Sequence, residues 1–209
     1  VHDGTAAFAS RGLVLSFFGK SSHASQPENG HNPARAISKL IIDIPELTAR
    51  EDHRGIVMAT VVCVRIGEEA FGTNAGFGQL MLTIRAEFES ELDALDAEIC
   101  ARARAYARQD GITNVEVQYR DSFPETRNTP DAVAAVRKAR LECELPEARW
   151  DEPFRSSEDF GCYTKLTSGA LFYIGCGTRH AKLHTREYDF NDEIIEPAVD
   201  MMFRLAQDA

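Results

Sequence analysis

The first 120 or so residues contain four short runs whose hydrophobic spacing is typical of β-strands. Residues 12–18 (GLVLSFF) are an apolar, β-rich run that ends at turn-forming Gly and Ser residues. Residues 55–66 and 77–88 are two further runs, and in the second Leu80, Leu82 and Ile84 alternate with less apolar positions. Residues 115–119 alternate again. The pattern therefore predicts four strands.

Two amphipathic helices are predicted between these strands. Asn32 and Pro33 supply an N-cap and a proline at the first helical position, and the helix is expected to stop or kink near Pro45. Ser90, with an acid three residues later, predicts a capping box at the start of the second helix, which should end at Gly111. The order strand, helix, strand, strand, helix, strand predicts a ferredoxin-like antiparallel sheet with both helices on one face.

The remaining residues predict a different kind of structure. A proline-rich polar crossing at 123–130 is a natural boundary, so we expect one domain over 9–122 and a second over 123–209. The predicted elements of the second domain are three helices and one strand: 130–143, a helix capped by Ser156 and running through Leu166, 170–174 and 193–206. A single strand cannot close a sheet, so this part is expected to need a partner, and the chain as a whole is predicted to be α+β.

Composition narrows the class of protein. The 209 residues are 44% hydrophobic and 27% charged, with a net charge of -10, which argues against nucleic acid and anionic membranes as partners. No apolar run approaches the roughly 20 residues of a membrane span. The five scattered cysteines indicate reduced thiols and a cytoplasmic protein. Because the chain opens at Val1, we expect a fragment boundary there.

Candidate chemistry concentrates in residues 155–192. His180 and His184 follow the predicted strand and a glycine turn, where open α/β sheets place their sites, and imidazole is the commonest protein metal ligand. The alternatives are a surface loop whose histidines have no role, or a helical zinc pair at i, i+4. Neighbouring Gly and Thr residues disfavour the helix.

Other polar residues of this stretch allow more than one interpretation. Glu158 and Asp159 could act as a general acid/base pair, or could simply favour a helix N-terminus. Cys176 could be a nucleophile beside a histidine, but no third group is in place to orient such a pair.

The ordered run EDF, Tyr, GALFYIG and LHTREYDFND resembles the C-terminal end of the aminoacylase and carboxypeptidase G family of dinuclear zinc peptidases. It is most similar to the branch that hydrolyses N-acyl amino acids. The resemblance implies that His184 is a ligand of a pair of divalent metal ions and that Glu158 and Asp159 support the site. The implied metal is zinc, with manganese or cobalt as alternatives. Asp189, just past His184, is placed where a carboxylate can orient a ligating imidazole.

Residues 19–25 (GKSSHAS) resemble the lid motif of the same family. The resemblance implies that His23 reaches across a homodimer into the neighbouring active site and steadies the developing oxyanion as a catalytic donor. Otherwise, His23 is a surface-loop residue.

Asn74 and Arg85 lie where the family has a lid asparagine and a strand arginine, both expected to contact substrate. The Ile-Pro of the family motif is missing after Asn74, and the interval to Arg85 is short. The alternative for Arg85 is a solvated strand charge.

The other metal ligands and the general base of the family come from residues upstream of the lid, and none of those patterns occurs here. We therefore expect the chain to be the lid domain and the C-terminal part of the catalytic domain of a metal-dependent amidohydrolase. Its substrates would be N-acyl amino acids or related small amides. Without its N-terminal catalytic half, the chain is expected to be inactive. The alternative is a non-catalytic dimerisation or binding module derived from that family.

Overall fold

The computed structural model describes residues 1–148, 152–178 and 180–207, and the chain divides into two compact units. The sheet unit comprises Phe8–Glu125 and Arg155–Glu158. The terminal unit comprises Val1–Ala7, Thr126–Phe154 and Asp159–Ala209. Each unit is described by itself below.

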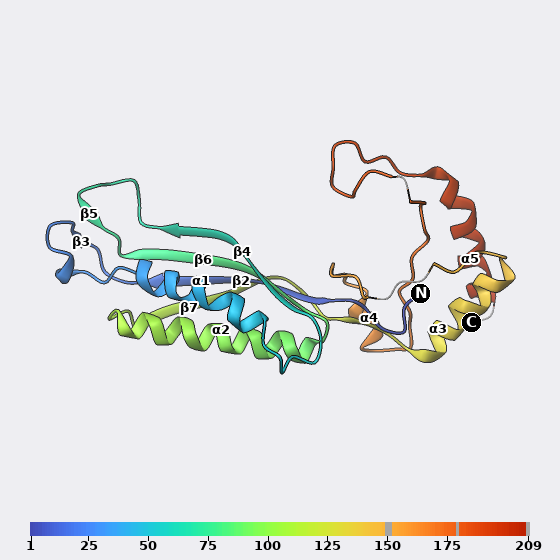
Figure 1. Ribbon diagram of the computed structural model, residues 1–209, viewed down its shortest axis with the longest axis horizontal. Coiled ribbons are helices and arrows are strands. Elements are labelled where there is room, and N and C mark those ends of the chain that lie inside the picture. The colour runs from blue at the N-terminus through green and yellow to red at the C-terminus, as the bar shows by residue number, and fades with distance from the viewer. Residues whose placement is uncertain (149–151, 179, 208–209) are drawn as a thin grey trace. The chain divides into compact units, whose positions relative to one another are not determined.

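The sheet unit is built on a four-stranded antiparallel sheet with the strand order β4-β6-β2-β7. The strands are β2 (Ala9–Phe18), β4 (Val57–Ile66), β6 (Phe77–Ala86) and β7 (Asn114–Phe123). Helices α1 (Ala34–Thr48) and α2 (Glu89–Gln109) lie side by side on one face of the sheet (Figure 1). The predicted order of strands and helices is confirmed.

The alternation in the sequence decides which face of the sheet the helices cover. In β6, Leu80, Leu82 and Ile84 are buried, whereas the positions between them are partly exposed. Leu13 and Phe17 of β2 are also fully buried in the same core. Each such side chain contributes about 1.5–3 kcal/mol by leaving water. The core of this unit therefore lies between the sheet and the two helices.

Two details of the helices differ from prediction. Helix α1 begins where predicted, and the Asn32 side chain accepts a hydrogen bond from the Ala34 amide (2.8 Å), but the helix continues through Pro45 to Thr48. Burial of Ile44 and Leu47 in the core explains this continuation.

The predicted capping box at Ser90 is wrong. Helix α2 starts at Glu89 and has no side-chain cap from its N-cap residue. The Glu89 amide instead donates to the buried carboxylate of Glu125. Glu125 lies 36 residues away in the sequence, so a local sequence pattern could not predict this contact.

Strand β2 is joined to α2 by a partly buried charged cluster. The Arg11 guanidinium contacts Asp96 at 2.6 Å and Asp93 at 2.9 Å, and it lies over the ring of Tyr119. Asp96 is only 6% exposed. The Cys100 thiol also donates to Asp96 (3.3 Å), and burial together with this carboxylate raises the pKa of Cys100 to about 12. Arg11 is therefore the positive charge that neutralises a buried acid.

The loop between α1 and β4 is fastened by a histidine that is bonded through both ring nitrogens. His53 Nε2 is 2.8 Å from the Leu47 carbonyl oxygen, and Nδ1 is 2.8 Å from the Glu91 carboxylate. Both partners can only accept, so both bonds together require the protonated ring. The Leu47 carbonyl, the Glu91 carboxylate and nearby Asp52 raise the pKa of His53 against the opposing effect of partial burial.

A pH dependence of stability follows from this contact. Because the pKa of His53 is higher in the folded than in the unfolded chain, its contribution of about 1 kcal/mol is complete below pH ~6.5 and is lost as pH rises through the folded pKa. Urea unfolding at pH 5 to 9 should show this decline in the wild type and not in His53→Gln. Parallel pH profiles for the two proteins would contradict the assignment.

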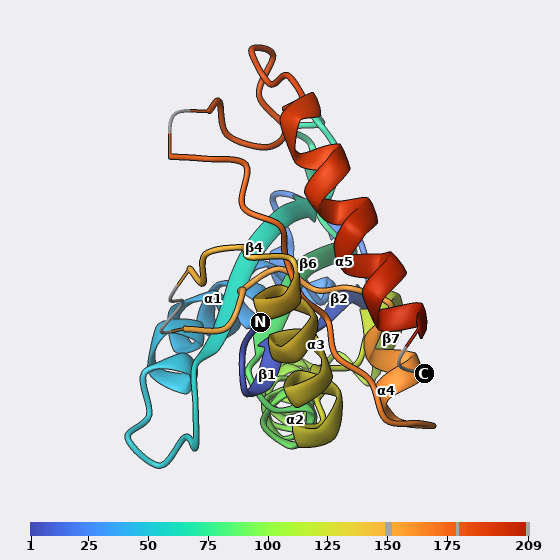
Figure 2. The same cartoon turned by 90° about the vertical axis from the view of Figure 1, so that its right-hand side faces the viewer.

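The terminal unit contains a two-stranded antiparallel ribbon and several helices. The ribbon pairs β1 (Gly4–Ala7) with β8 (Thr126–Asn128). The helices are α3 (Pro130–Glu142), α4 (Gly161–Thr164), the short 3₁₀ helix η2 (Asp192–Ile194) and α5 (Ile195–Gln207). The two long helices, α3 and α5, pack through Val136, Ala139 and Met201 (Figure 2). Both predicted long helices are confirmed.

Two predictions for this unit are wrong. The expected strand at 170–174 has no ladder partner in the described part of the chain. Its backbone is held by one side chain instead, since the Leu171 amide donates to Asn128 Oδ1 (2.7 Å) and Asn128 Nδ2 donates to the Leu171 carbonyl (3.0 Å). The short helix α4 starts only at Gly161, after Phe160, so Ser156 is not its cap.

Within the described residues no helix has both the length and the apolar character needed to cross a bilayer. All five cysteines are free thiols.

Candidate functional site

His23 lies on a small ribbon at one end of the sheet unit (Figure 1). Strand β3 (Ser22–His23) pairs antiparallel with β5 (Thr73–Asn74), which places His23 opposite Thr73 and Ser22 opposite Asn74. The Ala24 amide adds a hydrogen bond to the Gly72 carbonyl (2.9 Å). Two predicted site residues, His23 and Asn74, are therefore brought together from segments 50 residues apart.

The base of this ribbon depends on glycines. The Gly19 amide donates to the Gly76 carbonyl at 2.7 Å, joining the two connections that carry the ribbon. A Cβ at Gly76 would lie 2.3 Å from the Ser21 amide nitrogen, and a Cβ at Gly19 would lie 2.0 Å from the His31 carbonyl oxygen. Only glycine permits these backbone segments to approach so closely.

The Asn74 side chain is occupied by contacts inside the unit. Its Oδ1 accepts from Asn32 (2.7 Å), and its Nδ2 donates to Ser22 Oγ (3.1 Å) and to the Pro27 carbonyl (3.5 Å). Asn74 thus ties β5 to β3 and to the start of α1. Its predicted role as a substrate contact stays a prediction, but here it holds the His23 ribbon in shape.

Ser25 is a residue of this site that the sequence interpretation missed. Its hydroxyl oxygen lies 2.7 Å from His23 Nδ1, and its backbone amide donates to the same nitrogen at 3.2 Å. A hydroxyl two residues after a histidine in a loop is a common local hydrogen-bonding pattern and could have signalled this contact. His23 itself is exposed.

Arg85 lies at the other end of the sheet unit from His23. In β6 it pairs with Ser10 and Met58, eight residues along the strand from Phe77, which adjoins the ribbon. Its guanidinium donates to Ser157 Oγ (2.8 Å) and to the Arg155 carbonyl (3.2 Å). Arg85 therefore fastens the 155–158 segment to the sheet in this structure.

The other predicted site residues are exposed. Glu158 belongs to the sheet unit, whereas Asp159, His184 and Asp189 belong to the terminal unit, and all four are exposed. His184 has a left-handed backbone (φ 64°) in a turn closed by the bond from the Thr185 amide to the Lys182 carbonyl (3.2 Å). Left-handed residues other than glycine are uncommon and gather at functional sites.

The described residues do not form a complete metal site by themselves. No group of three or more His, Cys, Asp or Glu side chains able to hold an ion occurs among residues 1–148, 152–178 and 180–207. Since even a single catalytic zinc takes three protein ligands, the residues present do not fit the metal pair implied by the resemblance. At most, His184 can be one ligand.

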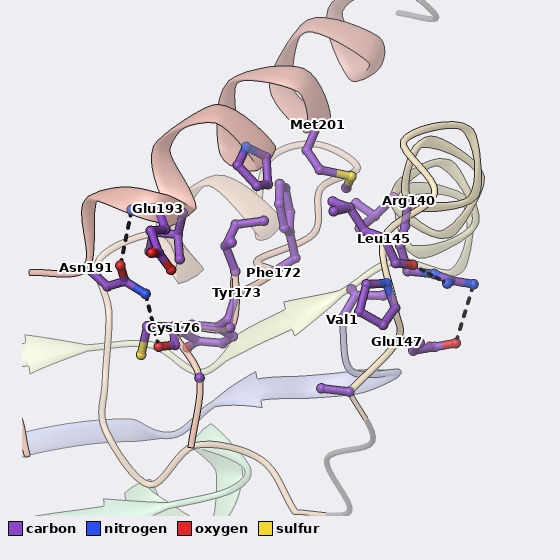
Figure 3. Close-up of a pocket in the computed structure, with 18 of the residues that line it drawn as sticks. Val1, Arg140, Leu145, Glu147, Phe172, Tyr173, Cys176, Asn191, Glu193 and Met201 are labelled. Atoms are coloured by element: carbon purple, nitrogen blue, oxygen red, sulfur yellow. Dashed lines mark hydrogen bonds and ion pairs between the residues drawn. The ribbon is translucent and has the colours of Figure 1, made fainter. Parts of the chain in front are cut away.

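The terminal unit also contains a cavity of about 520 Å³ between α3, residues 172–177 and the start of α5 (Figure 3). Most of its lining is apolar, including Leu145, Phe172 and Met201. Asn191 at its edge caps η2 by accepting from the Glu193 amide and also donates to the Cys176 carbonyl (3.4 Å). His184 does not line this cavity, so it is not the predicted catalytic site.

These features define a class of protein: a helix-covered α+β sheet domain that presents a histidine ribbon at one end, followed by a smaller unit. The chain belongs to the M20 peptidase dimerisation-domain family, because the family model described as "Peptidase dimerisation domain" matches residues 5–111. The match confirms the predicted resemblance.

Relatives extend the similarity to the second unit. N-acetyldiaminopimelate deacetylase of Bacillus licheniformis is 26% identical over 198 residues, covering 91% of this chain and 50% of the relative. Hippurate hydrolase of Campylobacter jejuni is 22% identical over 199 residues, covering 92% and 50%. A crystal structure of a dinuclear metal binding M20 peptidase from Bacillus subtilis superposes with a TM-score of 0.77 at 15% identity, covering 99% and 51%. The chain thus spans about half the length of these proteins.

Proposed function

We propose that this chain acts within a longer metal-dependent amidohydrolase that cleaves the amide bond of N-acyl amino acids or related small amides. In this proposal, residues 9–122 are a ferredoxin-like lid and dimerisation domain, and residues 123–209 are the C-terminal part of the catalytic domain. The remaining metal ligands come from a part of the protein outside these 209 residues. Zinc is the proposed metal, and the proposed compartment is the cytoplasm.

The observation that carries the proposal is the extent of the similarity. The matches to a deacetylase and to hippurate hydrolase cover both units, not only the dimerisation domain. Both names describe hydrolysis of an N-acyl group from an amino acid or its analogue.

Each predicted site residue has a role in this proposal. The exposed His23 on its ribbon would enter the active site of a second copy and donate a hydrogen bond to the developing oxyanion. His184 would be one metal ligand, with Asp189 close to it in sequence and Glu158 and Asp159 as supporting groups. Arg85 would meet the substrate carboxylate only by exchanging its present contact with Ser157.

The surface proposed for the dimer is the free edge of β4 together with α1. Strand β4 ends the sheet, and Val61, Val62 and Val64 along it are exposed, as is Ile42 of α1. The opposite edge strand, β7, instead exposes polar side chains such as Glu116. An apolar free edge favours pairing with another chain, and a second copy provides the same edge in a two-fold dimer.

Replacing Val62 by lysine should weaken this dimer. Val62 is 62% exposed, so the variant should fold normally, but two lysines near a two-fold axis would repel and lose their hydration. We expect the dimer dissociation constant to rise roughly 10- to 100-fold, measured by sedimentation. Leu166→Lys, at an 86% exposed position of the terminal unit, is the control. A monomeric wild-type chain at high micromolar concentration would contradict the proposed surface.

The function is tested with the full-length protein loaded with zinc, manganese or cobalt. It should hydrolyse N-acetyl or N-benzoyl amino acids, whereas the 209-residue chain should not. A full-length protein that dimerises but cleaves none of a broad panel of such amides would favour the non-catalytic module instead.

A further inference from the structure

We propose that Ser25 is a positioning residue that locks His23 in one neutral tautomer, with the proton on Nε2. The inference rests on the proposed function of His23 as an oxyanion donor. It goes beyond that function because it assigns the residue that decides which ring nitrogen can donate.

The first step is the direction of the hydrogen bonds at Nδ1. The Ser25 backbone amide donates to His23 Nδ1 at 3.2 Å, and a backbone N–H can only donate a hydrogen bond, never accept one. Nδ1 must therefore be unprotonated to accept it. The Ser25 hydroxyl, 2.7 Å from the same nitrogen, can turn its proton towards Nδ1 and strengthen the same arrangement.

The second step is the consequence for the other nitrogen. When a neutral imidazole accepts at Nδ1, its proton lies on Nε2. A ring held in this way keeps its Nε2–H directed away from its own loop. An oxyanion donor requires such a free N–H. The opposite tautomer would present a lone pair to the oxyanion and repel it.

The third step is the rigidity of the loop. The Gln26 amide donates to the His23 carbonyl at 2.9 Å, closing a turn around Ser25, and the Ala24 amide donates to the carbonyl of Gly72, the residue before β5. Ser25 thus reaches Nδ1 from a backbone that is fixed on both sides. The contact does not depend on substrate or metal, so it should exist in the isolated chain.

The test is the tautomer of His23, read by two-bond proton–nitrogen correlation spectra of the histidine-labelled chain at pH ~8, where an ordinary imidazole is neutral. The His23 signals are identified by their loss in His23→Gln. We expect a protonated Nε2 and a bare Nδ1 in the wild type and in Ser25→Thr. Ser25→Ala keeps only the longer amide bond to Nδ1 and loses the 2.7 Å bond from the hydroxyl, so it should show a mixture of both tautomers. Ser21→Ala, a change in the same loop, should match the wild type.

In the full-length enzyme, Ser25→Ala should lower kcat about five- to tenfold, the value of one ordinary hydrogen bond, with KM little changed. Ser25→Thr should restore it. A wild-type spectrum with the proton on Nδ1, or an unchanged tautomer in Ser25→Ala, would overturn the inference. The spectra do not depend on enzyme activity. They could therefore contradict the proposed tautomer even if the full-length protein is a hydrolase, and they could confirm it even if the full-length protein is inactive.

Discussion

Two inactive variants of the full-length protein should regain activity when their subunits are mixed. His23→Ala and His184→Ala should each lower kcat/KM by at least about 10²-fold, as expected for losing an oxyanion donor or a metal ligand. After denaturation and joint refolding, the mixture should recover roughly a quarter of the wild-type activity, because half of the two-fold dimers are mixed and each contains one intact site.

The recovery has a simple structural reason. If His23 of one copy serves the site that contains His184 of the other, a mixed dimer combines the two unmodified histidines in one of its two sites. His23 lies on an exposed ribbon at one end of the sheet unit, as such a reach requires. His23→Ala that is denatured and refolded alone is the control. If each variant is inactive but the mixture stays inactive while mixed dimers are present, His23 acts within its own subunit or not at all.

Arg11→Ala should destabilise the sheet unit by about 3–5 kcal/mol, because it leaves the carboxylate of Asp96 buried without its positive partner. The loss is measured as the free energy of unfolding of the 209-residue chain in urea. A double variant, Arg11→Met with Asp96→Leu, removes both charges and should recover most of the loss.

Arg50→Ala is the matched control for this prediction. Arg50 contacts Asp52 at the same 2.6 Å distance, but the two side chains are 50% and 65% exposed. A pair in water contributes little, so Arg50→Ala should cost less than about 0.5 kcal/mol. If Arg11→Ala were as mild as Arg50→Ala, the ion pair between Arg11 and Asp96 would not be a main stabilising contact of the sheet unit.

Local patterns predicted most of the sheet unit. The alternation of Leu80, Leu82 and Ile84 is a property of neighbouring positions, and so is the proline after Asn32 that begins α1. The failures occurred where a distant residue replaced the local one. Glu125 meets the start of α2 in place of Ser90, and Asn128 holds 170–174 in place of a strand.

The candidate site was predicted as a set of residues, not as an arrangement. His23 and Asn74 share a ribbon because glycines far apart in sequence let two loops touch. Arg85 lies at the far end of the same sheet and is occupied by Ser157. Residue spacing in the sequence could not predict that Arg85 lies far from His23 and Asn74, since its position depends on strand register.

By itself, the sequence determined the α+β class, the order of elements in the sheet unit and the family, because each depends on residue type at short range. Tertiary structure alone decided which polar groups meet: Arg11 with Asp96, His53 with Glu91, and Asn74 with Ser22 and Asn32. Such contacts join residues 38 to 85 positions apart, and a buried charge or a held imidazole depends on what folding brings beside it rather than on its neighbours in the chain.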